Sequence, residues 1–132
     1  MREEERRGTL DPARKVMASS RIWIREYVRG LLAQPPAGLH TVPVQNGPYP
    51  GVRITGGAVP LELYAHVEYI RVGILSTDPH VSESVRTVPG FEIIKPARKW
   101  YTGYVRDERG IVAIDRLLAG GVDGKVVTRL SQ

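Results

Sequence analysis

GVRITGGAVPLELYAHVEYIRVGIL, residues Gly51 to Leu75, is the stretch of sequence that decides the fold. Two runs rich in β-branched residues, Val52–Thr55 and Val59–Leu75, flank Gly56-Gly57, and a glycine pair adopts the positive φ angles of a tight turn at little cost. In the second run, apolar side chains alternate with polar ones, which is the period of a strand with one buried face. The pattern therefore predicts a β-hairpin.

The second run is long for a single strand. At about 3.3 Å per residue, Leu61–Leu75 would extend over roughly 50 Å, so we expect it to project from the core of so small a domain. Its alternation shifts near Ile70, which predicts a bulge or twist within Tyr69–Val72. A helix is the alternative, because four apolar residues also recur at helical spacing; Pro60 and the density of Val, Ile and Tyr favour the strand.

Length and composition limit the possible classes of protein. The chain has 132 residues, a formal net charge of +5 and no cysteine, so it should form one domain (11–132) behind a flexible charged arm (1–10), without disulfides or thiol chemistry. Its three histidines are scattered without ligand spacing, so we expect no metal and no cofactor. No signal-like core or long apolar run occurs, which predicts a soluble, unsecreted chain without a membrane partner.

An amphipathic helix is predicted near the N-terminus. Asp11 is a suitable N-cap, Pro12 suits the first helical position, and Gln34-Pro35-Pro36 must end the helix. Arginines lie on the side opposite the apolar stripe and would face solvent or phosphates. The predicted stripe consists of Ala13, Val16, Met17, Ser20, Ile24, Tyr27, Val28 and Leu31.

The segments on either side of the hairpin are shorter. Before it, we expect one strand in Leu39–Gln45 and then a turn-rich connector, Asn46–Gly51, without regular structure. After it, Ser76-Thr77-Asp78-Pro79 is a helix start signal, and a short helix would place Val81, Val85 and Val88 on one face before Pro89-Gly90.

The C-terminal third resembles a β-meander. Strands are predicted for Ala97–Arg106, Ile111–Leu118 and Lys125–Leu130, although Ile111–Ala119 could instead be a short helix capped by Gly120. The whole pattern predicts an α+β fold, in which the N-terminal helix packs on a mostly antiparallel sheet with a long projecting hairpin.

The densest chemistry lies within residues 95–106, where cations alternate with aromatic rings. Because phosphates bind the cations and bases stack on the rings, this ribbon could contact nucleic acid through Lys95, Arg98, Lys99, Trp100, Tyr101, Tyr104 and Arg106. A protein interface and a solvated strand with aromatic core anchors are the other two interpretations. A protein interface would use Glu62, Tyr64, His66, Glu68, Arg98, Trp100 and Tyr101.

No catalytic arrangement is predicted. Glu62 and Glu68 share one side of the expected strand but would lie about 20 Å apart, and paired-carboxylate catalysis needs about 5 to 10 Å. His66 and Glu68 lie side by side without a third group to complete a site. Ser82 and Ser84 lack the sequence context of an activated nucleophile. We therefore expect a protein that is not an enzyme.

The order of elements and one motif resemble a known family. The segment PYPGVRITGG carries Arg53, Thr55, Gly56 and Gly57 at the end of a strand, and with the preceding helix it resembles the tail terminator and neck proteins of long-tailed bacteriophages. The resemblance implies a virion protein, assembled in the host cytoplasm, that forms a ring, commonly a hexamer. Such a ring would contact tail tube or head-connector proteins, with passing contact to DNA. The family's longer second helix is not matched here.

Overall fold

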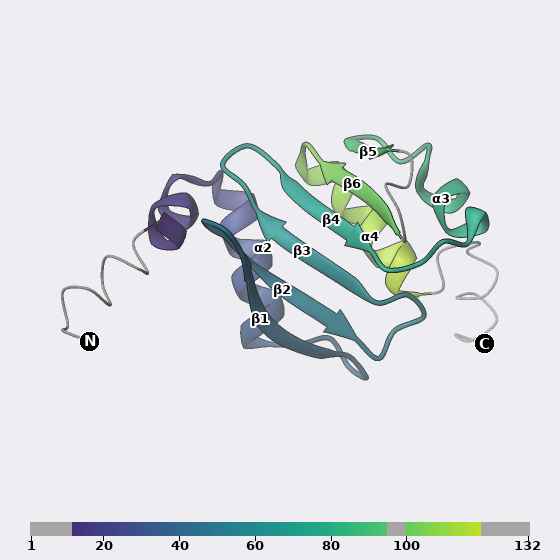
Figure 1. Ribbon diagram of the computed structural model, residues 1–132, viewed down its shortest axis with the longest axis horizontal. Helices are drawn as coiled ribbons and strands as arrows, with labels where there is room; N and C mark the ends of the chain where they lie inside the picture. Colours follow the sequence, from purple (N-terminus) through teal and green to yellow (C-terminus); the bar gives the residue numbers. More distant parts are fainter. Residues whose placement is uncertain (1–11, 95–99, 120–132) are drawn as a thin grey trace.

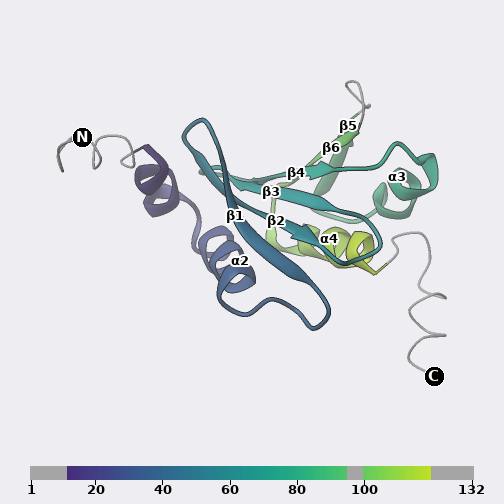
Figure 2. The same cartoon turned by 60° about the horizontal axis from the view of Figure 1, so that its bottom comes forward.

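The computed structural model describes residues 12–94 and 100–119, which form a two-layer α+β domain. All the strands pair antiparallel in one sheet, in the order β1-β2-β3-β4-β6-β5. Helices α2 and α4 lie on the same side of this sheet (Figures 1 and 2). The predicted fold class and the placement of an N-terminal helix against the sheet are therefore confirmed.

The predicted N-terminal helix is interrupted. Residues 12–19 are helical, and α2 spans Ile22–Ala33. Between them, the hydroxyl of Ser20 lies 2.9 Å from the carbonyl oxygen of His66. The N–H of Arg21 donates a hydrogen bond to the carbonyl oxygen of Val67 over 3.0 Å. Hydrogen bonds to a distant turn thus replace the next helical ones, and this tertiary contact divides the expected single helix.

β1 (His40–Asn46) and β2 (Tyr49–Thr55) form a tight hairpin that the sequence interpretation placed only in part. Asn46 pairs with Tyr49, so the loop is Gly47-Pro48, and Gly47 has a φ of +58°. The prediction that the connector Asn46–Gly51 lacks regular structure is therefore wrong, because Tyr49, Pro50 and Gly51 belong to β2. A two-residue loop with glycine at positive φ is sufficient to reverse the chain.

The predicted hairpin around Gly56-Gly57 is confirmed, but its long second strand is wrong. That run contains β3 (Leu61–Ala65) and β4 (Ile70–Ile74), which pair with each other in the middle of the sheet instead of projecting from it. The shift of alternation near Ile70 marks a turn, closed by the N–H of His66 donating to Tyr69 O over 3.0 Å. The helical alternative for this run is also wrong.

Only one of the two glycines in this turn needs positive φ. Gly56 has a φ of +94°, whereas Gly57 is constrained by space, because a Cβ there would lie 2.9 Å from the backbone oxygen of Leu118. Gly57→Val is expected to lower the free energy of unfolding by more than about 1 kcal/mol, since the bulkier side chain must displace the end of α4. Urea unfolding measures this, and a wild-type midpoint for the variant would contradict the contact.

The predicted short helix after the hairpin is confirmed as α3 (Pro79–Val85). Asp78 caps it by accepting a hydrogen bond from the N–H of His80 over 2.9 Å, and Pro79 occupies the first turn. Val81, Val85 and Val88 are all buried, as their spacing predicts.

The C-terminal third is not a meander. β5 (Phe91–Ile94) and β6 (Tyr101–Val105) pair antiparallel, and the 3₁₀ helix η1 (Glu108–Gly110) leads into α4 (Ile111–Leu118). The strand predicted for Ile111–Leu118 is wrong and the helical alternative is right. Ala113, Ile114 and Leu117 face the core at helical spacing, so burial outweighs the β-branched composition. The predicted strand Lys125–Leu130 and the arm 1–10 lie outside the described residues.

The core fills the space between the sheet and the helices. Its fully buried side chains come from alternate positions of the central strands and from one face of each of α2, α3 and α4. The largest of them are Ile24, Ile54, Leu61, Leu63, Ile70, Ile74, Ile114 and Leu117. The helices and the core lie on the same side of the sheet. The side chains on the other side of the sheet therefore face away from the core.

Candidate functional site: the open face of the sheet

The face of the sheet that points away from α2 and α4 carries a continuous polar and aromatic surface, which we call the open face. The register places Tyr64, Arg71, Tyr104 and Glu92 side by side across four strands. Their neighbours in sequence on β3 and β4, such as Leu63 and Val72, are buried on the other side. The open face consists of Tyr49, Arg53, Glu62, Tyr64, His66, Tyr69, Arg71, Glu92, Tyr104 and Arg106.

Aromatic rings stack along one end of the open face. His66 lies between two tyrosines, with ring centroids 3.7 Å from Tyr49 and 4.5 Å from Tyr69. Tyr104 meets Tyr69 edge to face at 5.2 Å, and the guanidinium of Arg106 lies 5.1 Å from the Tyr104 ring centroid. These contacts join residues of three different segments, namely β2, the β3–β4 turn and the end of β6, so they fix the side chains of this end relative to one another.

The surroundings of His66 favour its neutral form. Burial lowers the pKa of His66 from its ordinary value, and the positive charge of Arg71 lowers it further. The imidazole is therefore uncharged near neutral pH and stacks as an aromatic ring between Tyr49 and Tyr69. Glu68, which the sequence analysis placed beside His66 but rejected as part of a site, forms its ion pair with Arg21.

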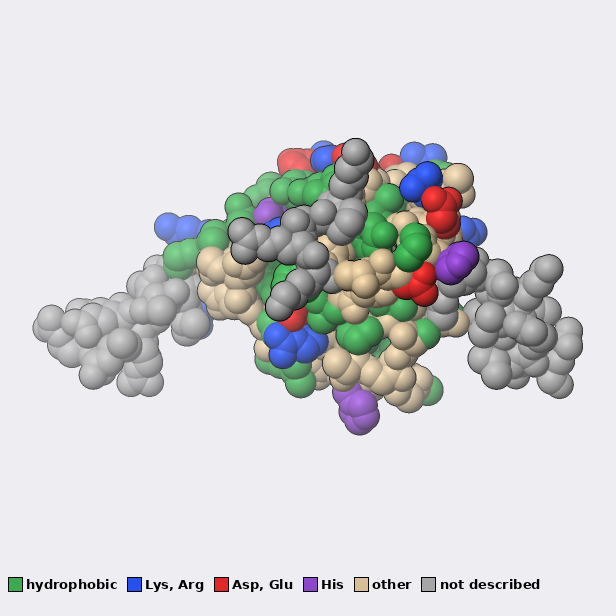
Figure 3. All heavy atoms as spheres, turned by 45° about the vertical axis from the view of Figure 1, so that its right-hand side comes forward, with side chains coloured by type: hydrophobic (Ala, Val, Ile, Leu, Met, Phe, Trp, Pro, Cys, Tyr) green, Lys and Arg blue, Asp and Glu red, His purple; other side chains and the backbone are tan. Residues whose placement is uncertain are grey.

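Acidic and basic side chains alternate on the open face. Arg53 and Glu62 form an ion pair at 2.7 Å, and Arg106 and Glu92 form another at 3.0 Å. The Tyr64 hydroxyl donates a hydrogen bond to Glu62 over 2.9 Å. Burial, together with this hydrogen bond to a carboxylate, raises the pKa of Tyr64. In the view of Figure 3, basic and acidic groups likewise lie beside one another rather than in patches of a single sign.

The residues predicted as an interface are only partly brought together. Glu62, Tyr64 and His66 lie on the open face, but Glu68 lies in the β3–β4 turn and forms an ion pair with Arg21 at 2.6 Å. Trp100 and Tyr101 are neighbours in sequence, and the alternation of a strand sends their side chains to opposite sides of the sheet. Trp100 lines a cavity of about 80 Å³ together with Glu62 and Tyr64, whereas Tyr101 lines a groove beside α3.

The predicted nucleic-acid ribbon is likewise divided. Tyr104 and Arg106 lie together on the open face. Trp100, which is 44% exposed, lies at the end of the open face opposite the stacked rings. Lys95, Arg98 and Lys99 lie outside the described residues. The single basic and aromatic ribbon expected from the sequence therefore becomes two surfaces, because Tyr101 points to the opposite side of the sheet.

Sequence reasoning missed five members of the open face: Tyr49, Arg53, Tyr69, Arg71 and Glu92. Tyr49 was assigned to an irregular connector, although Gly47-Pro48 is the kind of two-residue loop that would have placed it on a strand. The other four come together through strand pairing over long sequence distances. Their alternation was visible in the sequence, but the order of the strands was not.

No helix among residues 12–94 and 100–119 is long and apolar enough to cross a membrane. Within the same ranges, no three His, Asp or Glu side chains gather closely enough to hold a metal ion.

Comparison of the chain with protein-family models, with curated proteins and with solved structures found no match.

Proposed function

We propose that this protein is a structural subunit of a virion that assembles with copies of itself into a ring at the neck or tail of a bacteriophage. The observation that supports this proposal best is the open face. Among residues 12–94 and 100–119, helices cover the sheet on one side only, and the other side presents an ordered surface of tyrosines and ion pairs. Tyrosine and arginine are enriched in protein interfaces. The resemblance carried by Arg53, Thr55, Gly56 and Gly57 supplies the virion context.

The charges of the open face favour a second copy of the chain as its partner. Arg53 and Arg106 are each paired with a carboxylate of the same face, at 2.7 and 3.0 Å. A surface that carries both signs of charge can be complementary to a different surface of mixed charge on a neighbouring copy, whereas its carboxylates would repel the phosphates of a nucleic acid. The rings of Tyr49, His66 and Tyr69 already stack on one another, which leaves fewer ring faces for bases.

A ring requires each subunit to contact its two neighbours through different surfaces. Contacts of this heterologous kind close into rings when the rotation between subunits divides a full turn. In this proposal the open face provides one of the surfaces, and the ring contacts tail tube or head-connector proteins. Assembly would take place in the host cytoplasm and the final location would be the virion.

Light scattering coupled to size exclusion, followed by negative-stain microscopy, tests the proposal. We expect a mass that is a whole multiple of the 14.7 kDa subunit, and ring-shaped particles. A chain that stays monomeric, alone and when mixed with tail tube ends, would overturn it. A mobility shift with single-stranded DNA that weakens steeply with salt, shown by such a monomer, would favour the nucleic-acid hypothesis instead.

Arg106→Glu is expected to separate assembly from folding. The side chains of the Arg106–Glu92 pair are 52% and 54% exposed, so its loss should lower the free energy of unfolding by no more than about 1 kcal/mol. Placing a like charge in an interface costs several kcal/mol, so association should fall by at least about a hundredfold. Thermal melting and concentration-dependent light scattering measure the two effects.

Arg109→Glu is the matched control for this change. Arg109 also forms an exposed ion pair, with Asp107 at 3.0 Å, but it lies in η1 rather than on the strands of the open face. We expect the control to assemble like the wild type. If both variants lose assembly equally, the effect is one of net charge and the open face is not the contact surface.

A further inference from the structure

Arg71 is the one arginine of the open face that has no ion-pair partner among residues 12–94 and 100–119. The other two, Arg53 and Arg106, each bind a carboxylate of the same face. Arg71 is half-buried, and the strand register places it between Tyr64 and Tyr104. A cation that has lost part of its hydration and has no counter-ion is stabilised when a carboxylate is brought to it. The open face therefore has one cationic position that a partner can neutralise.

A cavity of about 80 Å³ opens beside Arg71. Gly73 lines it, and a Cβ there would lie no closer than 3.6 Å to the backbone oxygen of Glu62, so the space above this glycine is open. The indole of Trp100 and the hydroxyl of Thr102 add hydrogen-bond donors to the lining. The charge of Glu62 is already held in an ion pair at 2.7 Å. The cavity thus offers room and donors for a small anionic group such as a carboxylate.

Few acidic side chains of the described chain are available to reach this cavity from another copy. Five acidic side chains of residues 12–94 and 100–119 already form ion pairs. The others are Glu26, Asp78, Glu108 and Asp115. Asp78 is used as the cap of α3, and Asp115 lies near Tyr27, whose pKa is raised by burial and by this negative charge. This leaves Glu26 and Glu108, both of which are exposed.

Glu26 and Glu108 lie together on the helix side of the domain. They line the same shallow hollow between α2 and η1, and Ile22 and Trp23 line it with them; we call these four residues the α2 surface. Ile22 is 63% exposed and precedes Glu26 by one helical turn, so both project from the same face of α2. Arg21, which also lines the hollow, is already in an ion pair at 2.6 Å. The α2 surface therefore combines uncompensated carboxylates with an exposed apolar side chain.

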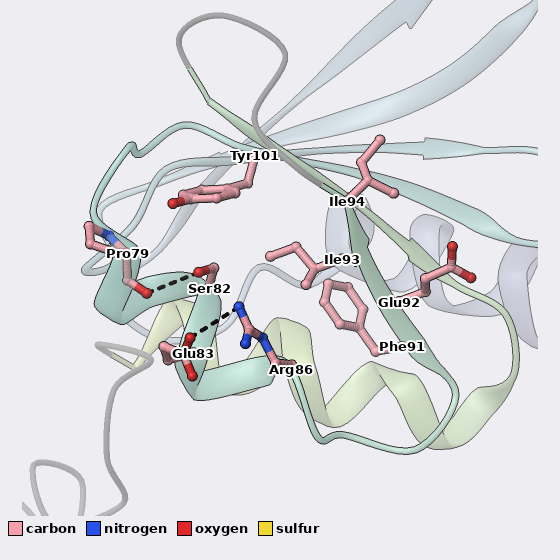
Figure 4. Close-up of a pocket in the computed structure, with 9 residues that line it drawn as sticks. All are labelled: Pro79, Ser82, Glu83, Arg86, Phe91, Glu92, Ile93, Ile94 and Tyr101. Atoms are coloured by element: carbon pink, nitrogen blue, oxygen red, sulfur yellow. Dashed lines mark hydrogen bonds and ion pairs between the residues drawn. The ribbon is translucent and has the colours of Figure 1, made fainter.

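The groove beside α3 does not offer this combination. A hollow of about 590 Å³ separates α3 from β5 (Figure 4), and Phe91 lies on its apolar side. Its two carboxylates, Glu83 and Glu92, are each held by an arginine of the same chain at 3.0 Å. Bringing either of them to Arg71 would break an existing ion pair, whereas Glu26 has none to lose among the described residues.

We propose that the α2 surface of one copy binds the open face of the next, with the carboxylate of Glu26 bound to Arg71 at the cavity. Ile22 would then lie against Trp100, which is 44% exposed, so that each copy covers an apolar side chain of its neighbour. The two surfaces belong to opposite layers of the domain, so the contact is heterologous and every copy can repeat it. This inference rests on the proposed function, for which it names the second contact surface.

Exchanging the two charges tests the contact. Arg71→Glu should weaken association at least about a hundredfold, because it sets a like charge against Glu26, and Glu26→Arg should do the same from the other side. Arg71→Glu/Glu26→Arg restores opposite charges in every contact between copies, so we expect its association to return to within about tenfold of the wild type. Concentration-dependent light scattering measures association, and thermal melting shows that each variant is folded.

Glu83→Arg is the matched control for the second change. Glu83 is also a helical glutamate, with a side chain that is 60% exposed, but it lies on α3. Arg71→Glu/Glu83→Arg has the same net charge as the exchanged pair and should stay as weak as Arg71→Glu. Recovery in both double variants, or in neither, would overturn this contact while an assembling wild type leaves the proposed function standing. A wild type that remains monomeric would overturn the proposed function and this contact together.

Gly73→Val tests the cavity without changing any charge. Gly73 lies in β4, where a Cβ makes only ordinary contacts and valine suits the strand, so thermal melting should not fall. Its methyl groups would fill the cavity that receives Glu26, so association should weaken at least about tenfold. A Gly73→Val protein that assembles like the wild type would overturn the proposal. So would one that assembles normally but no longer binds tail tube ends, because the cavity would then serve a different protein.

Discussion

Replacing Ile24 by alanine is expected to lower the free energy of unfolding by about 2 to 5 kcal/mol, the range for deleting a large buried aliphatic side chain. Ile24 is fully buried where α2 packs on the sheet, and it belongs to the same core cluster as Val52 and Leu63. Alanine would leave a cavity that neighbouring side chains can fill only partly, since strand pairing on both sides holds β2 and β3 in place. Chemical denaturation followed by circular dichroism measures the change.

Ile22→Ala is the matched control, because it makes the same chemical change two residues earlier on the same helix. The side chain of Ile22 is 63% exposed, so its truncation should alter the free energy of unfolding by less than about 0.5 kcal/mol. Similar losses in the two variants would mean that α2 packs with a different face toward the sheet.

Local patterns in this sequence predict the elements whose boundaries are set by their own residues. Asp78-Pro79 fixes the start of α3 through a side-chain cap and a proline, and both act within one turn. Alternation in Leu61–Ala65 predicts a strand with one buried face, which is what β3 is. These signals depend on neighbours in sequence, so a single chain is sufficient to find them.

Elements whose limits depend on distant partners were predicted incorrectly. Nothing near Ser20 in the sequence announces the helix break there, because the groups that cause it belong to the β3–β4 turn. Ile111–Leu118 has the composition of a strand but forms a helix, since Ala113, Ile114 and Leu117 are buried beneath the sheet. Propensity is a weak guide where tertiary burial decides the backbone.

The residues of the open face likewise divide into those that local sequence patterns predicted and those that depend on distant strand pairing. Tyr64 was a candidate because it lies on the polar side of an alternating run, and Tyr104 and Arg106 were candidates because cations and aromatic rings alternate around them. The structure places all three on one surface. Tyr49 and Tyr69, which stack on the two sides of His66, were not candidates, because these contacts depend on how the strands pair. The order β4-β6-β5, in which the last two strands are exchanged relative to the sequence, cannot be obtained from alternation alone.

Gly51→Ala should destabilise the protein by about 3 kcal/mol, the upper part of the usual range for forcing atoms into a packed site. A Cβ at position 51 would overlap the backbone oxygen of Leu63 and lie 2.8 Å from the Tyr64 ring. The carbonyl belongs to the paired strand β3 and cannot move aside without disturbing the β2–β3 ladder. The position thus requires glycine for space, since its φ is not positive.

The same substitution at Gly30 should have the opposite sign. Gly30 lies exposed within α2, and a Cβ there would meet nothing within 4 Å. Alanine restricts the unfolded chain and suits the helix, so Gly30→Ala is expected to raise the free energy of unfolding by about 0.5 to 1 kcal/mol. Parallel urea titrations compare the two variants. A Gly51→Ala protein as stable as Gly30→Ala would mean that β2 and β3 lie further apart than the register requires, and the open face built on that pairing would then have to be redrawn.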